Sequence, residues 1–480
     1  MNISTSIFEK LPYVDEAAVD ALLLEEIKKN QKKIVVLDDD PTGGQTTHDL
    51  VEYTNWSKES IRRGFAEENN LFLILTNSRG ATREKTIDIH KEVVKNVEEV
   101  ARECGKEYIF ISRSDSTLRG HYPIEMEVVK EEYSRYTGHS IDGEILCPFF
   151  KEGGRFTFDD VHYVRYGDTL LPAGETEFAK DPTFGYHHSN LKDYIEEKTQ
   201  GEYSASSVTS ISLDDLRACN YDKITDQLMS VKDFHKIIAN IADYVDLKVF
   251  CVALYRAMAR GKSYMIRTAA SMVKVMCANP DVPLLSREEM LKGLIPDSED
   301  RKKNAAGVII VGSHTSKTTL QLERLKTRQD IRFIELNANL VKDEAAFAAE
   351  VNACLKEEED CLRSGKTVCI YTTRDLITAD TGDKEDELRL SVRISDAIQE
   401  LIGRLTVRPS FLIAKGGNTS SDIATKALGI QRAYILGQIM PGTPVWRAGE
   451  ESRFPGIPYV VFPGNVGDED TLLEAVKKLI

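Results

Sequence analysis

The chain of 480 residues is long enough for two or three domains, and its 41% hydrophobic content is typical of a folded globular protein. It carries 62 basic and 77 acidic residues, a formal net charge of −15 at pH 7. This balance argues against binding to nucleic acid or anionic membranes, since either partner requires a basic surface. The longest apolar stretches are far shorter than the ~20 residues of a membrane-spanning helix. The first residues also lack the basic and apolar regions of a signal peptide.

The eight cysteines indicate a cytoplasmic protein. No two of them form a CxxC pair, and most lie within apolar or helical stretches. This pattern predicts reduced, buried thiols rather than a disulfide framework or a zinc site. The histidines show no metal-binding spacing either, which disfavours a structural zinc site.

In the N-terminal half, short apolar runs are each followed at once by a polar loop that contains glycine. Four such runs predict strands at residues 32–37, 71–75, 108–112 and 144–147. The charged stretch at 81–103 has helical spacing. Strands that alternate with helices predict a parallel α/β sheet, whose ligands gather beyond the carboxyl ends of the strands.

A second α/β domain is predicted beyond residues 278–304, a proline-bearing and strongly charged segment that is the best linker candidate. After it the strand–loop–helix pattern returns. The predicted strands are residues 307–311, 367–371, 411–415 and 459–463. We therefore expect two α/β domains with mainly parallel sheets and a break near residues 290–305.

The loop after the first strand begins with three consecutive aspartates, residues 38–40. Adjacent carboxylates repel one another, so holding them together requires hydrogen-bond donors or a metal. A solvated turn is the simple alternative, because Asp, Pro and Gly are common in turns. The position of the aspartates favours a functional loop in which Asp39 or Asp40 accepts the proton of a substrate hydroxyl. Coordination of Mg²⁺ is the competing role.

Later loops of the same domain supply the opposite charge. The planar guanidinium of arginine suits a carboxylate, and amides, hydroxyls and aspartates suit sugar hydroxyls. Together these loops predict a pocket for a small polyhydroxy anion, although pairing of the arginines with nearby aspartates is the alternative. The candidate residues are Asn77, Ser78, Arg79, Arg113, Asp115, Ser116, Arg119 and Arg155.

Three loops of the second domain predict a phosphate site. Each follows a predicted strand and lies near a helix start, where free N–H groups and the helix dipole attract anions. One such loop would be weak evidence, because Ser, Thr and Asn are ordinary N-cap residues; three favour a nucleotide. The candidate residues are Ser313, Gly416, Gly417, Asn418, Thr419, Gly464 and Gly467. No Walker A loop and no GxGxxG motif is present, which disfavours a P-loop and a dinucleotide cofactor.

The ordered set of motifs resembles the four-carbon acid sugar kinases. From Ile34 onward the sequence contains, in this order, LDDDPTGGQT, LTNSRG, SRSDSTLRGHYPIE, PFFKEGGR, VGSHTSKTTLQ, AKGGNTSSDIA and FPGNVGDEDTL. The resemblance implies a sugar-acid-binding domain at residues 1–290, a nucleotide-binding domain at 291–480 and a ligand site in the cleft between them. It implies ATP-dependent phosphorylation, with Mg²⁺, of the terminal hydroxyl of an acid such as threonate, erythronate or a 3-oxo relative.

Carried over by position, the resemblance assigns Asp39 and Asp40 to catalysis, with Asp40 the favoured base, and Thr42 and Gly43 to the substrate. The nucleotide loop has Asn418 where the family commonly has glutamate. The alternatives are a non-catalytic sugar-acid-binding or regulatory protein, and an oxidoreductase with an unusual nucleotide fold. We expect partners to be small molecules rather than nucleic acid or membrane, and the sequence leaves a homodimer open.

Overall fold

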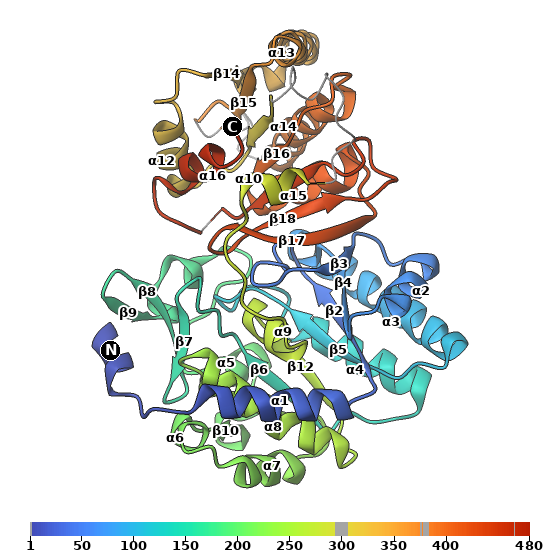
Figure 1. The fold of residues 1–480 in the computed structure, drawn as a ribbon, viewed down its shortest axis with the longest axis vertical. Coiled ribbons are helices and arrows are strands. Elements are labelled where there is room, and N and C mark those ends of the chain that lie inside the picture. The colour runs from blue at the N-terminus through green and yellow to red at the C-terminus, as the bar shows by residue number, and fades with distance from the viewer. Residues whose placement is uncertain (1, 293–305, 375–376, 378–383, 465) are drawn as a thin grey trace. The chain divides into compact units, whose positions relative to one another are not determined.

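The computed structural model describes residues 2–292, 306–374, 377, 384–464 and 466–480. The chain divides into two compact units, Met1–Asp281 and Val282–Ile480. Each unit contains a largely parallel sheet with helices around it (Figure 1), which confirms the predicted fold class. The boundary at residue 290 and the cleft between the domains stay predictions, and most of the predicted linker lies outside the described residues.

The sheet of the first unit is parallel throughout. In spatial order its strands are β10 (Thr209–Ile211), β11 (His235–Ala239), β6 (Gly143–Cys147), β12 (Tyr264–Thr268), β5 (Tyr108–Arg113), β2 (Lys33–Asp38), β4 (Leu71–Leu75) and β3 (Leu50–Tyr53). The four predicted strands correspond to β2, β4, β5 and β6, with ends within one residue of the prediction. Their residues are buried almost without exception, as expected for strands covered by helices on both faces.

The helices of this unit form two main groups. In the first group α3 (Arg83–Cys104) contacts both α2 (Lys58–Ala66) and α4 (Ile124–Thr137). In the second group α8 (Tyr244–Ala259) contacts four helices, which are α1 (Glu16–Lys29), α6 (Leu213–Arg217), α7 (Tyr221–Ser230) and α9 (Ala270–Met276). The predicted helix at 81–103 is α3. Thr82 caps its N-terminus through a hydrogen bond from the Lys85 N–H, and Gly105 ends it in the left-handed conformation.

A small antiparallel sheet interrupts the α/β pattern. Its order is β1 (Ile3–Ser4), β9 (Thr169–Pro172), β8 (Val161–Tyr166) and β7 (Arg155–Phe158), and α5 (Leu191–Lys198) follows it. The sequence did not predict these strands, because residues 142–210 show no clear period. This sheet carries Arg155 at the first position of β7.

In the second unit, the spatial order is β17 (Arg432–Met440), β18 (Thr443–Ala448), β19 (Pro458–Phe462), β16 (Leu412–Lys415), β13 (Val308–Val311), β15 (Thr367–Thr372) and β14 (Ile331–Leu336). The strands from β19 to β14 are parallel, and β17 and β18 form an antiparallel pair that was not predicted. The four predicted strands are β13, β15, β16 and β19. Among the described residues of this unit the α-helices are α10 (Arg287–Leu291), α12 (Ser316–Leu325), α13 (Glu344–Arg363), α14 (Lys384–Arg404), α15 (Gly417–Asp422) and α16 (Thr471–Lys477).

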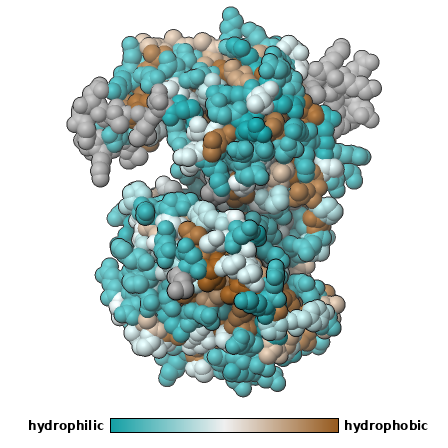
Figure 2. All heavy atoms as spheres, turned by 90° about the vertical axis from the view of Figure 1, so that its left-hand side faces the viewer, coloured by the Kyte–Doolittle hydropathy of each residue, from teal (hydrophilic) through white to brown (hydrophobic). Residues whose placement is uncertain are grey.

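The face drawn in Figure 2 is mostly hydrophilic, with hydrophobic residues gathered in small areas. Within the described residues, no helix is long and apolar enough to cross a membrane. All eight cysteines are free thiols. The prediction that they are buried is wrong for Cys104, which is exposed, and for Cys219, Cys277 and Cys361, which are partly exposed. Cys104 and Cys361 lie in helices, Cys219 and Cys277 lie in turns that follow helices, and the sequence did not show which way these side chains point.

Candidate functional site

Three predicted loops of the first unit meet at one edge of the sheet, because their strands are neighbours. Asp38, the last residue of β2, is the register partner of Arg113 in β5 and of Leu75 in β4. The chain leaves all three strands at this edge, so loops distant in sequence come together there.

Arg79 and Arg113 hold the three aspartates together. Arg79 donates from Nε to Asp39 at 3.0 Å and from Nη1 to Asp40 at 3.0 Å. Arg113 Nη1 lies 3.1 Å from Asp38 Oδ1 and 3.5 Å from Asp40 Oδ1. For these two arginines the structure therefore shows the internal pairing that was the alternative interpretation. Their charge offsets the repulsion within the acidic loop.

Asp40 is the most accessible aspartate of the three. Its side chain is 15% exposed, against 3% for Asp39 and none for Asp38. Thr42 donates both its N–H, at 2.8 Å, and its hydroxyl to Asp40 Oδ1. Burial alone would raise the pKa of Asp40, but Arg79 and the other donors outweigh it and hold this pKa below its usual value. In Asp39 burial prevails over Arg79, and the pKa is raised.

Gly43 and Glu52 both lie against Asp38. A Cβ atom at Gly43 would lie 1.7 Å from Asp38 Oδ2, so only glycine fits there. Glu52, in β3, is fully buried, and neither of its carboxyl oxygens has a hydrogen-bond partner. Burial and then the charge of Asp38 raise the pKa of Glu52 well above its usual value. Sequence reasoning missed Glu52, although one acid inside an apolar run was an available signal.

The loop after β4 contributes mainly through its backbone. Asn77 has φ 50°, in the left-handed region, and its N–H donates to the Asp38 carbonyl at 3.3 Å. Ser78 is fully buried, and its hydroxyl lies 3.2 Å from that of Thr76. The side chain of Ser78 therefore faces the interior.

A second pair of arginines lies over one aromatic ring. The guanidinium carbons of Arg119 and Arg155 lie 5.1 Å and 5.6 Å from the centre of the Phe178 ring. Arg119 is paired with Asp115, its Nε donating to Oδ2 at 2.9 Å. The neighbouring Ser116 is partly exposed.

Arg155 differs from the other candidate arginines because it has no acidic partner. It is 6% exposed and donates to the Gly153 carbonyl, while its Nε atom has no hydrogen-bond partner. Among the described residues no carboxylate forms an ion pair with its guanidinium, and Asp115 and Glu177 act on its charge only at longer range. Burial lowers its pKa. A buried cation without a counter-ion is costly, and an anionic ligand would supply the missing charge.

The three predicted loops of the second unit also converge, because they follow the adjacent strands β19, β16 and β13. A Cβ atom at Gly312 would lie 2.4 Å from Thr419 Oγ1, one at Gly416 3.1 Å from Ser313 Cβ, and one at Gly464 3.7 Å from Ser313 Oγ. Gly416 and Gly467 have positive φ values, 121° and 81°. The structure thus places these loops close together, and Gly417 and Asn418 begin α15 beside them. Asn465, in the third loop, lies outside the described residues.

Two basic residues near these loops were not predicted. Lys415 ends β16, is fully buried and donates to the Pro463 carbonyl. Burial, and then the charge of Lys317, lower its pKa to about 7. Arg374 follows β15 and donates to Thr319 at 2.8 Å, while its Nε and Nη1 atoms have no hydrogen-bond partner. Arg374 adds positive charge near the glycine loops, whereas Lys415, with a pKa of about 7, is only partly charged at neutral pH.

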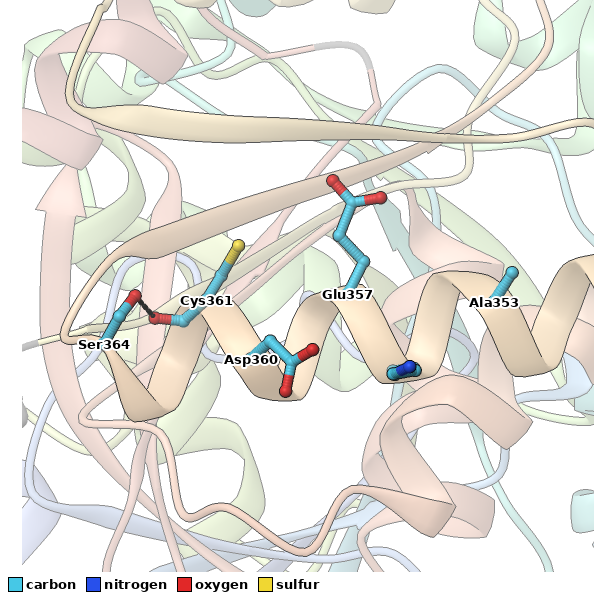
Figure 3. A pocket seen from close by; sticks show the side chains of 6 residues that line it. Ala353, Glu357, Asp360, Cys361 and Ser364 are labelled. Atoms are coloured by element: carbon cyan, nitrogen blue, oxygen red, sulfur yellow. Dashed lines mark hydrogen bonds between the residues drawn. The ribbon is translucent and has the colours of Figure 1, made fainter.

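The described residues include no group of three or more His, Cys, Asp or Glu side chains arranged to hold a metal ion. The carboxylates of Asp38, Asp39 and Asp40 are already engaged by arginines, so they do not present a set of ligands for Mg²⁺. The surface hollow in Figure 3 is lined by residues of α13 and the turn after it, among them Glu357 and Cys361, and by none of the predicted site residues.

Comparison with known protein families also divides the chain into two domains. Residues 34–276 match the model of a sugar-binding N-terminal domain, and residues 308–472 match that of a nucleotide-binding C-terminal domain. No curated protein matches the sequence significantly.

Two solved structures share the fold. The Haemophilus influenzae protein HI1011 is 18% identical, with a TM-score of 0.57 over 93% of this chain and 100% of that one. A Salmonella typhimurium protein provisionally described as a tRNA synthase is 15% identical, with a TM-score of 0.64 over 92% and 98% of the two chains. At these identities the likeness shows the fold alone.

Proposed function

The chain belongs to the family that combines a sugar-binding N-terminal domain with a nucleotide-binding C-terminal domain, and we propose that it is an ATP-dependent kinase acting on a four-carbon sugar acid. The phosphoryl group would go to the terminal hydroxyl of an acid such as threonate, erythronate or a 3-oxo relative. The domain matches support a sugar kinase in general. That the substrate is an acid is inferred from the arginine side chains of the first unit.

The observation that carries the choice of an acid is the unpaired Arg155. A neutral sugar would leave this buried guanidinium without a counter-ion, whereas a carboxylate would accept two parallel hydrogen bonds from it. Arg119 shares the Phe178 ring with Arg155 and adds a second positive charge. We infer that the carboxylate binds at Arg155 and that Asp115, Ser116 and the loop backbone bind hydroxyls.

Asp40 is the residue we assign to the reacting hydroxyl. Its lowered pKa keeps it ionised, and its partial exposure lets a ligand reach it. In phosphoryl transfer the main requirement is to hold the attacking oxygen in line with the phosphate, so a firmly positioned carboxylate is suited to accept the hydroxyl proton. Asp39, buried and bound twice by Arg79, then orients the arginine.

The nucleotide is assigned to the converging loops of the second unit. Ser313 and the Gly416–Thr419 segment offer hydroxyls and backbone N–H groups, and Gly464 and Gly467 allow phosphate oxygens to approach the backbone. Bound with ATP, Mg²⁺ would neutralise phosphate charge. The described residues do not form a metal cage, so we assign no protein ligand to this ion.

The rival is a protein that captures a sugar acid without chemistry. Such a protein would need Arg155 but would gain nothing from three carboxylates gathered beside the anion site. The oxidoreductase alternative has no dinucleotide fingerprint in the sequence to support it.

An assay of ADP release with ATP, Mg²⁺ and a panel of four-carbon sugar acids tests the proposal, with five- and six-carbon acids and the matching neutral alditols as controls. We expect turnover with at least one four-carbon acid and none with the alditols. Binding of an acid without ADP release would favour the capture protein. Turnover of neutral sugars alone would contradict the role given to Arg155.

A further inference from the structure

The loop after β5 presents Asp115, Ser116 and Arg119, which are assigned above to the sugar acid. Its backbone is irregular, since Leu118 has φ 68° and Gly120 has φ 116°. A residue with a side chain rarely stays in the left-handed region unless its surroundings hold it there. The positions of the three binding side chains therefore depend on what supports this loop.

Four consecutive carbonyl groups of the loop each accept a hydrogen bond from a side chain of another segment. The pairs are His162 Nε2 with Ser116 O at 2.8 Å, Tyr186 Oη with Thr117 O at 2.8 Å, Tyr194 Oη with Leu118 O at 2.8 Å, and Arg267 Nη2 with Arg119 O at 3.1 Å. A run of four neighbouring carbonyls held one by one fixes the path of the backbone through the whole turn.

The donors are almost fully buried, with exposures of 0% for His162 and Tyr194, 3% for Tyr186 and 1% for Arg267. Water is therefore a poor replacement for any of them. The Ser116 carbonyl can only accept, so Nε2 of His162 carries the proton and Nδ1 accepts the Thr157 hydroxyl at 3.0 Å. Burial lowers the pKa of His162 to about 4, which keeps the ring neutral near pH 7.

Three of the four donors come from one segment, residues 155–198, between the start of β7 and the end of α5. The same segment supplies Phe178, beneath Arg119, and Asp181, whose Oδ2 lies 3.7 Å from Arg119 Nη1. It also begins with Arg155. One inserted segment thus supports the loop backbone, orients Arg119 and carries the unpaired cation.

We propose that residues 155–198 are the specificity element of the sugar-acid site, in which His162, Tyr186 and Tyr194 act as positioning residues. They do not touch the ligand but fix where the side chains of the loop at 115–120 stand. The identity of the ligand rests on the proposed function, whereas the support of the loop does not.

The substitutions Tyr186→Phe and Tyr194→Phe each remove one donor and keep the ring. Tyr264→Phe is the matched control, because its hydroxyl donates to the Leu228 carbonyl at 2.8 Å and the residue is 3% exposed, at the opposite end of β12 from Arg267. We expect each of the first two variants to raise KM for the sugar acid by roughly 10-fold or more, with KM for ATP unchanged. The control should leave both constants unchanged.

Hydrogen–deuterium exchange of the amides at 115–120, measured without ligand, separates this inference from the proposed function. The loop should exchange faster in Tyr186→Phe and Tyr194→Phe than in the wild type or in Tyr264→Phe. A wild type that binds no sugar acid would refute the proposed function, and the exchange would still decide whether the segment supports the loop. Equal exchange in all four proteins would overturn the inference. It would also be overturned if Tyr264→Phe raised KM for the sugar acid as much as Tyr186→Phe and Tyr194→Phe do.

Discussion

Asp38 and Glu52 are both fully buried, and after burial the charge of Asp38 is the largest cause that raises the pKa of Glu52. Burial is the largest cause, and it raises the pKa of Asp38 to about 7 despite the charge of Arg113. An unfolded chain would release the proton of Asp38 near pH 4. Between pH 4 and pH 7 the folded protein therefore binds more protons, and its free energy of unfolding falls as the pH rises.

Glu52→Gln should weaken this pH dependence, because it removes a second buried acid whose pKa is raised in the folded protein. We expect the variant to be more stable than the wild type at pH 8 by roughly 1–3 kcal/mol, measured by urea unfolding between pH 4 and pH 9. Glu98→Gln is the control, since Glu98 is bound by Arg102 and Tyr108 and its loss should destabilise. A pH dependence that is the same in Glu52→Gln and the wild type would refute the raised pKa of Glu52.

Asp40→Asn should lower kcat by about 10²- to 10⁴-fold, the usual contribution of a general base. The amide keeps the shape of the side chain and loses its proton-accepting charge. ATP should still raise the melting temperature as in the wild type. Asp39→Asn is the comparison: a larger loss of turnover there than in Asp40→Asn would move the base to Asp39.

Arg155→Met should raise KM for the acid by about 10- to 100-fold, the worth of a charged hydrogen-bonded pair. Binding of a neutral alditol should not change. Removing an unpaired buried charge should not lower the melting temperature, which separates lost binding from lost folding. The neighbouring Arg165, exposed at the end of β8, gives the control Arg165→Met. If both variants bind the acid equally well, Arg155 is not the carboxylate site.

Gly43→Ala should disrupt the acidic loop. The added methyl group would collide with Asp38 Oδ2, and the strain should cost about 1–3 kcal/mol in urea unfolding and abolish binding of the acid. Gly403→Ala, in α14, is the control, because the nearest atom to its Cβ would be 3.8 Å away. That change should be neutral or stabilising. Wild-type stability in Gly43→Ala would show that the loop can move aside.

Glu358, in α13, is fully buried, and neither of its carboxyl oxygens has a hydrogen-bond partner. Burial raises its pKa well above the usual value, so folding near pH 7 requires it to take up a proton. Glu358→Met should therefore stabilise the protein by roughly 1–3 kcal/mol. Glu359→Met, one position on, should destabilise it, since Glu359 accepts from Thr406 and pairs with Arg363 at 2.7 Å. Thermal unfolding of the two variants gives the comparison, and a drop in both would contradict the assignment for Glu358.

The sequence by itself determined the parallel α/β architecture of both units and the loops that follow their strands. This was possible because buried parallel strands are short continuous apolar runs, and because glycine and polar residues stand where each run stops. The eight predicted strands lie within one residue of those in the structure. The order of motifs also indicated the family.

Only the tertiary structure decided what each polar side chain does. Arg79, Arg113 and Arg155 are alike in sequence, yet the first two neutralise aspartates and the third has no acidic partner. The partners of an arginine depend on which strands become neighbours, and local sequence does not carry that information. The small sheet that places Arg155 was missed for another reason: buried and exposed positions do not alternate in its short strands β7 and β8, so no periodic pattern marks them.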